Sequence, residues 1–277
     1  DGATGYEENF AGFTGLYADT VLDLLEVGAG TGLLDVAAGT GATSMRAAAR
    51  GATVLATDFA PGMVRVAEQR LRDGGFAGSS ARQMDGQALD LADDSYDAGV
   101  SMFGLMFFPD PGAGVAELAR VVRPGGRIGI ATWDLEAYAM HRLIGAALEV
   151  AVPGFGDHER PSPTWAPLGT VDGLATLLGA AAVTQVDVRS VVQRWHFEDP
   201  ARFFREMPSW SCPVRPLFQM LPADRVDAAA AAFAEIVAAD DGLPGGAGVT
   251  MSALVATATV AVARVRAAAN DGGRVGS

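Results

Sequence analysis

The stretch Leu33-Leu-Asp-Val-Ala-Ala-Gly-Thr-Gly-Ala-Thr-Ser-Met-Arg-Ala-Ala-Ala-Arg50 decides the fold. Its apolar beginning, Leu33–Ala37, predicts a buried strand, and the helix formers of Ala42–Arg50 predict a helix. The glycines between them predict a tight turn. A side chain at Gly39 or Gly41 would block a ligand that approaches this turn and the N-terminus of the helix. The stretch therefore predicts a strand, a ligand-binding loop and a helix in succession.

A second glycine-rich stretch, Glu26-Val-Gly-Ala-Gly-Thr-Gly32, lies just upstream and competes for the same role. The two stretches are too close together for both to be strand-to-helix turns. The upstream one follows a helical pattern, Leu16–Leu25, and precedes a strand. We interpret it as the linker that ends this helix, where glycine supplies left-handed backbone.

The glycine loop alone does not identify a ligand. A nicotinamide-binding fingerprint needs a third glycine three positions after Gly41, where Ser44 stands, and a P-loop needs a lysine, which the chain lacks. A tight turn that binds nothing is the other interpretation of the loop taken alone.

The first half of the chain alternates between strand and helix patterns, which predicts a parallel sheet with right-handed crossovers. Pro124-Gly-Gly126 is expected to separate the last helix of this half from its last strand. The predicted strands are Leu33–Ala37, Thr53–Thr57, Ala81–Met84, Tyr96–Met102 and Arg127–Trp133, and the predicted helices are Ala42–Arg50, Pro61–Arg72 and Gly114–Val122.

The second half has a different composition and predicts additions to this sheet. Val183–Phe197 and Val249–Val262 have strand composition, and Pro200–Ala239 is mostly helical with proline interruptions. Val152–Pro167 is rich in Pro and Gly and should be irregular, whereas Val171–Leu178 should be a helix. The fold class that follows is α/β, with a doubly wound sheet that is mostly parallel, a C-terminal antiparallel strand and a helical lid.

Composition and charge exclude several function classes. The 277 residues carry a formal net charge of -13, and all 20 basic residues are Arg, so nucleic acid is not an expected partner. Cys212 is the only cysteine, which excludes an internal disulfide and argues against a cysteine-based metal site. We predict no metal. The first residues do not resemble a signal peptide and no segment is apolar for long enough to cross a bilayer, so we expect a cytoplasmic protein.

Two carboxylates follow consecutive strands. Asp58 closes the second predicted strand and Asp85 the third, and the carboxyl ends of parallel strands meet at one edge of the sheet. A carboxylate in this place can accept hydrogen bonds from both hydroxyls of a ribose bound across the first turn, although a solvated strand-end aspartate has the same sequence pattern. Ligands of open α/β sheets bind at this edge.

Four motifs in order resemble those of class I S-adenosylmethionine-dependent methyltransferases. They are Leu34-Asp-Val-Ala-Ala-Gly-Thr-Gly41, Ala56-Thr-Asp-Phe-Ala-Pro-Gly-Met63, Asp85-Gly-Gln-Ala-Leu89 with Asp93-Asp-Ser-Tyr-Asp97, and Leu118-Ala-Arg-Val-Val-Arg-Pro-Gly-Gly126. The resemblance covers Leu33–Trp133. It is nearest to the methyltransferase type 11 group, which includes ubiquinone and menaquinone biosynthesis enzymes and natural-product methyltransferases, and it implies a Rossmann-like fold.

The resemblance implies a cofactor site for S-adenosylmethionine. Backbone near Ala37–Gly39 would approach the methionine part, Asp58 would hold the ribose hydroxyls, and Asp85 would accept from the adenine amino group. Phe59 and Met63 would pack on the adenine. The full set of cofactor-binding residues that it implies is Tyr17, Asp35, Ala37, Ala38, Gly39, Thr40, Gly41, Asp58, Phe59, Met63, Asp85, Gly86, Gln87, Ser101, Met102 and Phe103.

Two departures from the family pattern bear on this site. The first glycine of the usual loop is Ala37 here, a substitution that the group tolerates. The segment Phe10–Tyr17 lacks the Arg that many relatives place near the cofactor carboxylate, and Tyr6, Thr14 or Tyr17 are the available replacements, or there is none. The expected division of the chain is 1–32 as a helical segment over the cofactor, 33–135 as the cofactor-binding core, 136–266 as the substrate lid with the late strands, and 267–277 as a tail.

Few side chains are candidates for a general base. His141 follows the fifth strand and is the first choice, His158 and His196 come after it, and a packed or surface histidine is the alternative for each. Aromatic residues and methionines, among them Phe107 and Phe108, favour an apolar or aromatic acceptor. The predicted substrate contacts are Phe13, Met106, Trp133, Trp165, Trp210 and Phe218, with Val152–Pro167 and Pro200–Leu221 as candidate lids.

The sequence supports three hypotheses. The first is O- or C-methylation of a small organic acceptor, which would leave S-adenosylhomocysteine as the product. The enzyme would be a monomer or a homodimer, and its binding partner would be the small-molecule substrate. The second keeps the cofactor but catalyses a different step, such as a cyclisation or a pericyclic reaction. The third is a binding protein without catalysis on the same fold.

Overall fold

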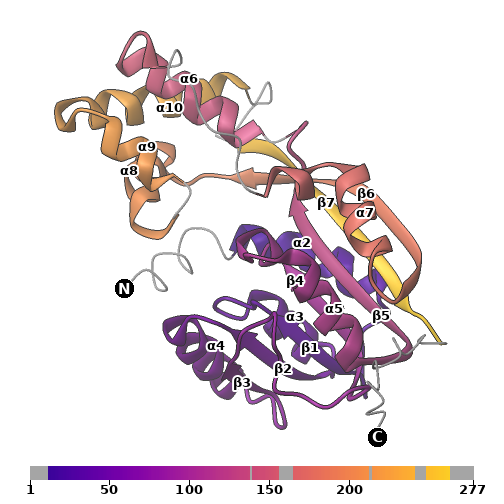
Figure 1. Ribbon diagram of the computed structural model, residues 1–277. Helices are drawn as coiled ribbons and strands as arrows, with labels where there is room; N and C mark the ends of the chain where they lie inside the picture. The colour runs from indigo at the N-terminus through magenta and orange to yellow at the C-terminus, as the bar shows by residue number, and fades with distance from the viewer. Residues whose placement is uncertain (1–11, 138, 156–164, 212–213, 241–247, 263–277) are drawn as a thin grey trace, which may run out of the picture.

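One sheet of seven strands organises the molecule. The computed structural model describes residues 12–137, 139–155, 165–211, 214–240 and 248–262. The strand order is β3-β2-β1-β4-β5-β7-β6 (Figure 1). The pairs from β3 to β5 are parallel, and β7 is antiparallel to both of its neighbours, as expected from the sequence.

The strands agree with the sequence patterns to within a few residues, except at the start of β5. They are β1 (Gly32–Val36), β2 (Thr53–Asp58), β3 (Ser80–Gln83), β4 (Tyr96–Met102), β5 (Val122–Trp133), β6 (Val183–His196) and β7 (Gly248–Val260). The long helices of the described ranges are α2 (Gly12–Leu24), α3 (Ala42–Ala49), α4 (Pro61–Asp73), α5 (Pro111–Val121), α6 (Ala139–Ala151), α7 (Val171–Gly179), α8 (Pro200–Trp210), α9 (Arg215–Met220) and α10 (Val226–Asp240). The same described ranges also contain the short 3-10 helices η2 (Leu105–Phe107), η4 (Ala166–Gly169) and η5 (Ala223–Arg225).

The choice between the two glycine-rich stretches is confirmed. The strand β1 ends at Val36, and α3 begins at Ala42 directly after Gly41, so the second stretch is the strand-to-helix turn. The upstream stretch follows α2 and precedes β1, and its Gly30 has a φ of 83°. The left-handed residue at the end of α2 itself is Glu26, with a φ of 57°, so the expectation that a glycine ends this helix is wrong.

Local residue choices set several helix starts. Proline occupies the first position of α4, α5 and α8, where its missing N–H would have no partner within the helix. The carboxylate of Asp110 accepts from the N–H of Ala113 at 3.0 Å, and that of Asp199 accepts from Arg202 at 2.9 Å. These caps fix where α5 and α8 begin.

The Pro-Gly-Gly prediction is wrong in one respect, because the segment lies within β5 rather than before it. Val122 pairs with Tyr96, and the next pair along the strands is Arg127 with Ala98, so the register shifts across the extra residues. Gly125 has a φ of 78°, which bends the chain out of the ladder and back. The strand therefore begins five residues earlier than its apolar core indicates.

A helix that the sequence patterns did not identify, α6, joins α8, α9 and α10 in a helical cap. This cap lies beyond the carboxyl ends of β5 and β6 (Figure 1). The helix α10 packs on α6 and α8. Its fully buried residues Ala229, Ala230, Phe233 and Val237 recur at helical spacing, so the Ala-rich stretch buries one face.

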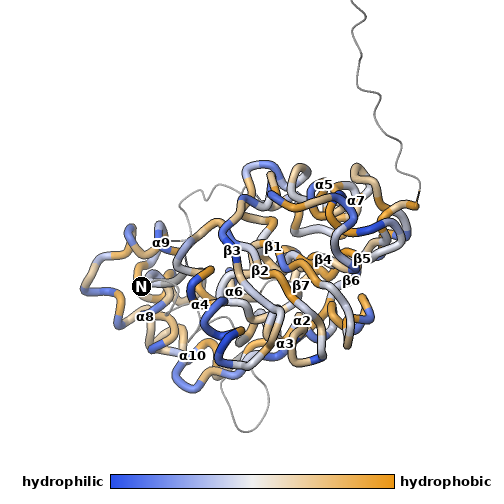
Figure 2. The backbone as a smooth tube through the Cα atoms, turned by 90° about the horizontal axis from the view of Figure 1, so that it is seen from below, coloured by the Kyte–Doolittle hydropathy of each residue, from blue (hydrophilic) through white to orange (hydrophobic). Residues whose placement is uncertain are grey.

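The hydropathy of the chain follows this arrangement. Figure 2 shows hydrophobic residues along the central strands β1 and β4 and hydrophilic residues along α4. Within the described ranges, no helix combines the length and the apolar composition that a membrane span requires. Cys212 and the tail 267–277 lie outside the described residues.

A buried aromatic cluster joins the sheet, α2 and the cap. The ring of Phe13 stacks on Trp195 with 4.6 Å between centroids and on Trp133 with 5.7 Å, and Trp133 stacks on Phe103 at 4.2 Å. Trp195 also contacts Phe203 of α8 at 4.7 Å. The cluster runs without interruption from the end of β4 to the cap.

Close packing of α2 on the sheet depends on Gly129 in β5. A Cβ atom at this position would lie 2.6 Å from Val21 Cγ1 and 3.0 Å from Leu25 Cδ1, both on or next to α2. We expect Gly129→Val to lower the free energy of unfolding by about 2 kcal/mol, because the added atoms overpack a core that cannot yield. Urea denaturation measures the change.

The control is Gly179→Ala at the end of α7, where nothing lies within 4 Å of the added Cβ. This variant should keep the stability of the unchanged protein. Equal stability of the Gly129→Val protein would show that α2 does not pack against β5 as described.

Candidate functional site

A cavity of about 580 Å³ lies where β1, β2 and β4 end. Its volume falls within the range of about 300–1,000 Å³ that small-molecule sites occupy. Most of the residues that the sequence assigns to the cofactor line it: Asp35, Ala37, Ala38, Gly39, Thr40, Asp58, Phe59, Met63, Asp85, Gly86, Gln87, Met102 and Phe103.

The glycine loop is held in a left-handed conformation at alternate residues. Ala37, Gly39 and Gly41 have φ angles of 56°, 57° and 82°. The N–H of Ala38 donates to the carbonyl of Thr57 at 2.9 Å, and Arg70 donates to the carbonyl of Thr40 at 3.0 Å. Because a left-handed conformation costs a non-glycine residue about 1–2 kcal/mol, Ala37 is strained, and the surrounding bonds hold it there.

The end of β4, which also lines the cavity, repeats this strain. Phe103 has a φ of 59°, and its N–H donates to the carbonyl of Ala131 at 2.8 Å. A Cβ atom on the next residue, Gly104, would lie 2.4 Å from the Cβ of Ala37. The two strand ends therefore approach as closely as they do because residue 104 has no side chain. Strained backbone of this kind concentrates at functional sites.

Asp58 connects the end of β2 to the glycine loop. Its Oδ2 accepts from the N–H of Gly39 at 2.9 Å, and its Oδ1 accepts from the N–H of Ala60 at 2.8 Å. Burial raises the pKa of this carboxyl, although the hydrogen bonds from Ala60 and Gly39 partly oppose the shift. The carboxylate lines the cavity, so it is available to a ligand while it also fixes the loop.

Asp35 is a buried acid at the base of the cavity. Its side chain is fully buried, and its Oδ2 accepts from the Ser44 hydroxyl at 2.6 Å. Burial raises the pKa of Asp35 to about 7, and the charge of Asp58 adds to this rise, whereas the Ser44 hydrogen bonds oppose it. Asp35 therefore keeps its proton to a higher pH than an exposed aspartate does.

Three buried polar atoms have no hydrogen-bond partner among the described residues. They are Asp35 Oδ1, Thr40 Oγ1 and Ser101 Oγ. Asp35 and Thr40 line the cavity, whereas Ser101 lies behind its wall. An orphaned buried polar atom costs free energy unless something binds it, so the first two atoms fit a ligand that offers polar groups at the glycine loop.

Asp85 and Gln87 form the other end of the cavity, on the segment between β3 and β4. The Oδ1 of Asp85 accepts from the backbone N–H of Gln87 at 2.9 Å and from its side-chain amide at 3.2 Å. The Gln87 Oε1 in turn accepts from the N–H of Asp110 at 2.8 Å. Phe59 lines the cavity as well and is 73% exposed, so a ligand ring could cover it.

Three residues assigned to the cofactor do not line this cavity. Tyr17 is fully buried, and its hydroxyl donates to the carbonyl of Met251 at 2.8 Å, which attaches α2 to β7. Gly41 precedes α3, where a Cβ atom would lie 3.2 Å from that of Ala67. Ser101 is buried beneath Gly104.

The predicted substrate residues whose side chains are described do not line the cavity. Phe13 and Trp133 belong to the aromatic cluster, and Met106 and Trp165 are buried. Phe218 packs on Phe204 at 4.9 Å, and Trp210 is the last residue of α8. Nothing is described of the Trp210 side chain, so a substrate role for this residue stays a prediction.

The candidate bases are not brought together with the cavity in the described structure. His141 is exposed on α6, with its ring 6.4 Å from that of Trp165, and His196 is exposed at the end of β6. His158 and Tyr6 lie outside the described residues.

Several residues of the cavity were not identified as ligand contacts from the sequence, and Thr14 was only one of three open choices. Ala42 and Thr43 form the first turn of α3, and their place after Gly41 was the available signal. Phe107 and Phe108, which follow β4, line the cavity as the aromatic pattern indicates. Ala60, Met84, Gly104 and Pro109 complete the lining.

Comparisons with known proteins agree with this geometry. Residues 34–130 match a family described as "Methyltransferase domain". An uncharacterised protein of Mycobacterium tuberculosis is 38% identical over 151 residues, which cover 54% of this chain and 51% of the relative. A demethylmenaquinone methyltransferase of Thermobifida fusca is 38% identical over 133 residues, covering 47% and 52%. The chain thus spans about half the length of the curated relatives it matches.

Solved structures share the fold at low sequence identity. The [4+2]-cyclase SpnF has a TM-score of 0.54 and 22% identity, over 90% of this chain and 82% of that one. Phosphoethanolamine N-methyltransferase 2 of Haemonchus contortus, in complex with S-adenosyl-L-methionine, has a TM-score of 0.54 and 14% identity, over 89% and 52%. Residues 34–130 thus resemble the methyltransferase domain family, as the four sequence motifs indicate.

The raised pKa of Asp35 predicts a pH-dependent stability. Between about pH 4 and pH 7 the folded protein holds a proton on Asp35 that the unfolded chain has lost, so this group's contribution to stability falls as the pH rises through that window. We expect Asp35→Asn to gain stability relative to the unchanged protein as the pH increases from 4 to 7. Thermal melting without ligand at several pH values measures the difference.

Asp73→Asn is the control for this effect, because Asp73 is an exposed carboxylate on α4 that bonds to Gln69 at 2.7 Å. The melting difference of Asp35→Asn is judged against that of Asp73→Asn at each pH. Parallel pH profiles for Asp35→Asn and the unchanged protein would contradict the assignment of a raised pKa to Asp35.

Proposed function

We propose that this chain binds S-adenosylmethionine in the cavity and transfers its methyl group to a small, apolar or aromatic organic molecule. One observation carries the proposal. A single cavity of about 580 Å³ is lined by the glycine loop, by Asp58 and by Asp85, which come from the ends of three different strands or the segments after them. The order β2-β1-β4 also puts this cavity where the direction of the crossovers reverses, which is the usual ligand position in an open α/β sheet.

The charges around the cavity fit a cationic ligand. Its lining includes the carboxylates Asp35, Asp58 and Asp85 and, among the described residues, no Arg or His. S-Adenosylmethionine has a positive sulfonium and an ammonium group, whereas a phosphate-containing cofactor would be repelled. The orphaned oxygens of Asp35 and Thr40 support a polar ligand group at the glycine loop.

The cavity residues divide between the parts of the cofactor. Asp58 would accept from the ribose hydroxyls, Asp85 would accept from the adenine amino group, and Phe59 and Met63 would cover the adenine faces. When bound, the cofactor supplies a methyl group that its sulfonium charge has already activated. The remaining work of the protein is to orient the acceptor and exclude water.

The end of the cavity near β4 supports an apolar acceptor. Met102, Phe103, Phe107 and Phe108 line it, and Phe107 is 62% exposed. Among the described lining residues there is no histidine to serve as a base, so an acceptor with an already nucleophilic carbon or phenolate fits better than an alcohol. His141 as a base would need closure of the cap, which stays a prediction.

The relatives support methyl transfer as the chemistry but no particular acceptor, because each match covers about half of the relative. The net charge of -13 favours a small molecule over nucleic acid as substrate. We place the protein in the cytoplasm, in natural-product or cofactor biosynthesis, on composition and resemblance.

A non-methylating reaction is the second candidate. The same lack of a described base suits a cyclisation in which the bound cofactor is not consumed, and the fold is shared with a [4+2]-cyclase. Incubation with S-adenosylmethionine and a panel of aromatic and quinol acceptors separates the two candidates. Formation of S-adenosylhomocysteine together with a methylated product supports methyl transfer, and conversion of an acceptor with no S-adenosylhomocysteine would overturn it.

Cofactor binding can be tested without knowledge of the acceptor. We expect Asp58→Asn to weaken the binding of S-adenosylhomocysteine about 10- to 100-fold, because it replaces a charged acceptor of the ribose hydroxyls by a neutral amide. Isothermal titration calorimetry measures the dissociation constant. The unchanged protein should bind S-adenosylhomocysteine with one site per chain.

Asp73→Asn serves again as the control, since this exposed carboxylate lies on α4 outside the cavity. It should bind with the affinity of the unchanged protein. The ribose assignment fails if Asp58→Asn, folded as judged by circular dichroism, binds as tightly as the control.

A further inference from the structure

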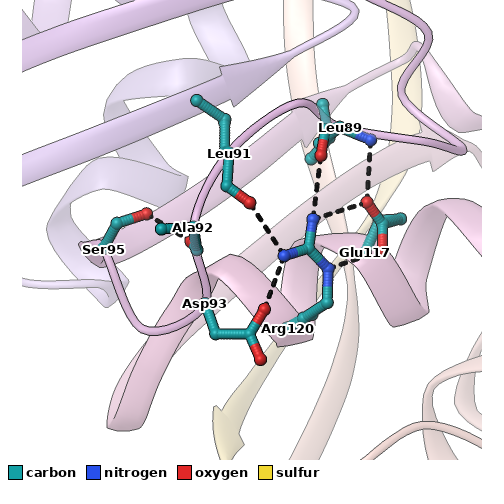
Figure 3. Close-up of polar contacts among 7 residues, drawn as sticks. All are labelled: Leu89, Leu91, Ala92, Asp93, Ser95, Glu117 and Arg120. Atoms are coloured by element: carbon teal, nitrogen blue, oxygen red, sulfur yellow. Dashed lines mark hydrogen bonds and ion pairs between the residues drawn. The ribbon is translucent and has the colours of Figure 1, made fainter.

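The segment between β3 and β4, residues 84–95, brings Asp85 and Gln87 to the cavity and then crosses over α5. Apart from two short turns it has no regular structure, so its backbone groups need partners from elsewhere. A single side chain of α5, Arg120, bonds two of the segment's carbonyls, those of Leu89 and Leu91 (Figure 3). We call residues 84–95 the adenine segment, since the proposed function puts the adenine against its first residues.

The guanidinium of Arg120 donates hydrogen bonds in two directions. Toward the adenine segment it donates to the carbonyls of Leu89 at 2.9 Å and Leu91 at 2.8 Å, and to the carboxylate of Asp93 at 2.6 Å. Toward its own helix it donates to both carboxylate oxygens of Glu117, at 2.7 and 2.8 Å. This use of the whole planar fork is specific to arginine.

Glu117 completes the arrangement from the same helix. Its Oε2 accepts from the backbone N–H of Leu89 at 2.7 Å, so α5 holds both the N–H and the carbonyl of this one buried residue. The hydrogen bond from Arg120 lowers the pKa of Glu117, and the bond to Glu117 raises that of Arg120. The side chains are 20% and 30% exposed, so this pair is better shielded from solvent than an ordinary surface ion pair.

The contacts of α5 with Leu89 also restrain the cavity residue Gln87, which lies two positions earlier in the chain. Leu89 follows Gln87 by two positions, and Gln87 donates twice to Asp85. The N-terminal end of α5 holds Gln87 as well, because the N–H of Asp110 donates to its Oε1 at 2.8 Å. The helix α5 therefore fixes the adenine segment at Gln87 and again at Leu89, one on each side of Ala88.

We propose that Glu117 and Arg120 are positioning residues that hold Asp85 and Gln87 in their binding arrangement before the cofactor arrives. The inference rests on the proposed function. Neither residue lines the cavity, so their effect on binding is exerted through the adenine segment. If the segment is already ordered, ligand binding costs no further conformational entropy there. An ordered segment also keeps Asp85 in position to bond to one edge of the base.

Base selectivity distinguishes positioning from mere support of the fold. Asp85 would accept a hydrogen bond from the 6-amino group of adenine, and hypoxanthine has an oxygen at that place, which repels a carboxylate. A well-placed Asp85 therefore favours S-adenosylhomocysteine over its S-inosyl analogue. A loosened segment would lose affinity for the adenosyl ligand and much of this preference together.

The experiment measures the binding of S-adenosylhomocysteine and S-inosylhomocysteine to the full chain by calorimetry. We expect Arg120→Gln to weaken adenosyl binding about tenfold and to reduce the adenosyl-to-inosyl ratio by a similar factor, as expected for loss of a charge-assisted fork. Arg120→Lys, which keeps the charge without the fork, should show most of the same loss.

Arg123→Gln is the matched control. Arg123 follows shortly after α5 and pairs with Asp97 at 2.7 Å, outside the adenine segment. This variant loses an ion pair of the same length as the Arg120–Glu117 contact and should keep both the affinity and the ratio. Should Arg120→Gln fail to fold, Glu117→Gln provides the same two readouts.

The outcomes separate this inference from the proposed function. If the unchanged protein binds neither ligand, both the proposed function and this inference are overturned. If the unchanged protein binds with adenosyl preference and Arg120→Gln keeps both affinity and ratio, the inference alone is overturned. A fall in affinity with an unchanged ratio also overturns it, because support of the fold without positioning of Asp85 has that result.

Discussion

The hydrogen bond from the Gly39 N–H to the Asp58 carboxylate is the contact on which the site depends. It joins the turn between β1 and α3 to the end of β2, at 2.9 Å, and so fixes the loop against the strand that carries its acid. The same loop has left-handed backbone at Ala37, Gly39 and Gly41. A loop of any other conformation would point the same residues elsewhere.

The order of the strands converts this local turn into a cavity. Along the strand order, the connection from β1 to β2 runs in one direction and the connection from β4 to β5 runs in the other. The helices that follow β1 and β4 therefore lie on opposite faces of the sheet. The ends of β1 and β4 can approach each other closely because Gly104 has no side chain. Ala37 after β1 and Phe103 after β4 both have strained, left-handed backbone. Three aspartates line the cavity, the buried Asp35, the half-buried Asp58 and the exposed Asp85, which suits a positive ligand.

The aromatic residues illustrate how one composition can serve two purposes. Phe13 and Trp133, which were expected to contact substrate, instead form a continuous stack from Phe103 to the helical cap. The rings nearest to the cavity mouth are Phe107 and Phe108, on the segment that follows β4. Apolar side chains from distant strands look alike in a sequence, and only the sheet register decides which of them meet one another and which meet a ligand.

The sequence by itself determined the strand-to-helix turn, the succession of strands and helices through β5, the late antiparallel strand and most of the residues around the cavity. Each of these rests on neighbours within a few positions, where glycine, proline and apolar periodicity act directly. The tertiary structure alone decided that α6 joins a cap, that Pro124-Gly-Gly lies in a bulge within β5, and that Tyr17 attaches α2 to β7. It also revealed the partnership of Arg120 with Leu89, 31 positions away, because contacts across such separations depend on how strands and helices pack rather than on local pattern.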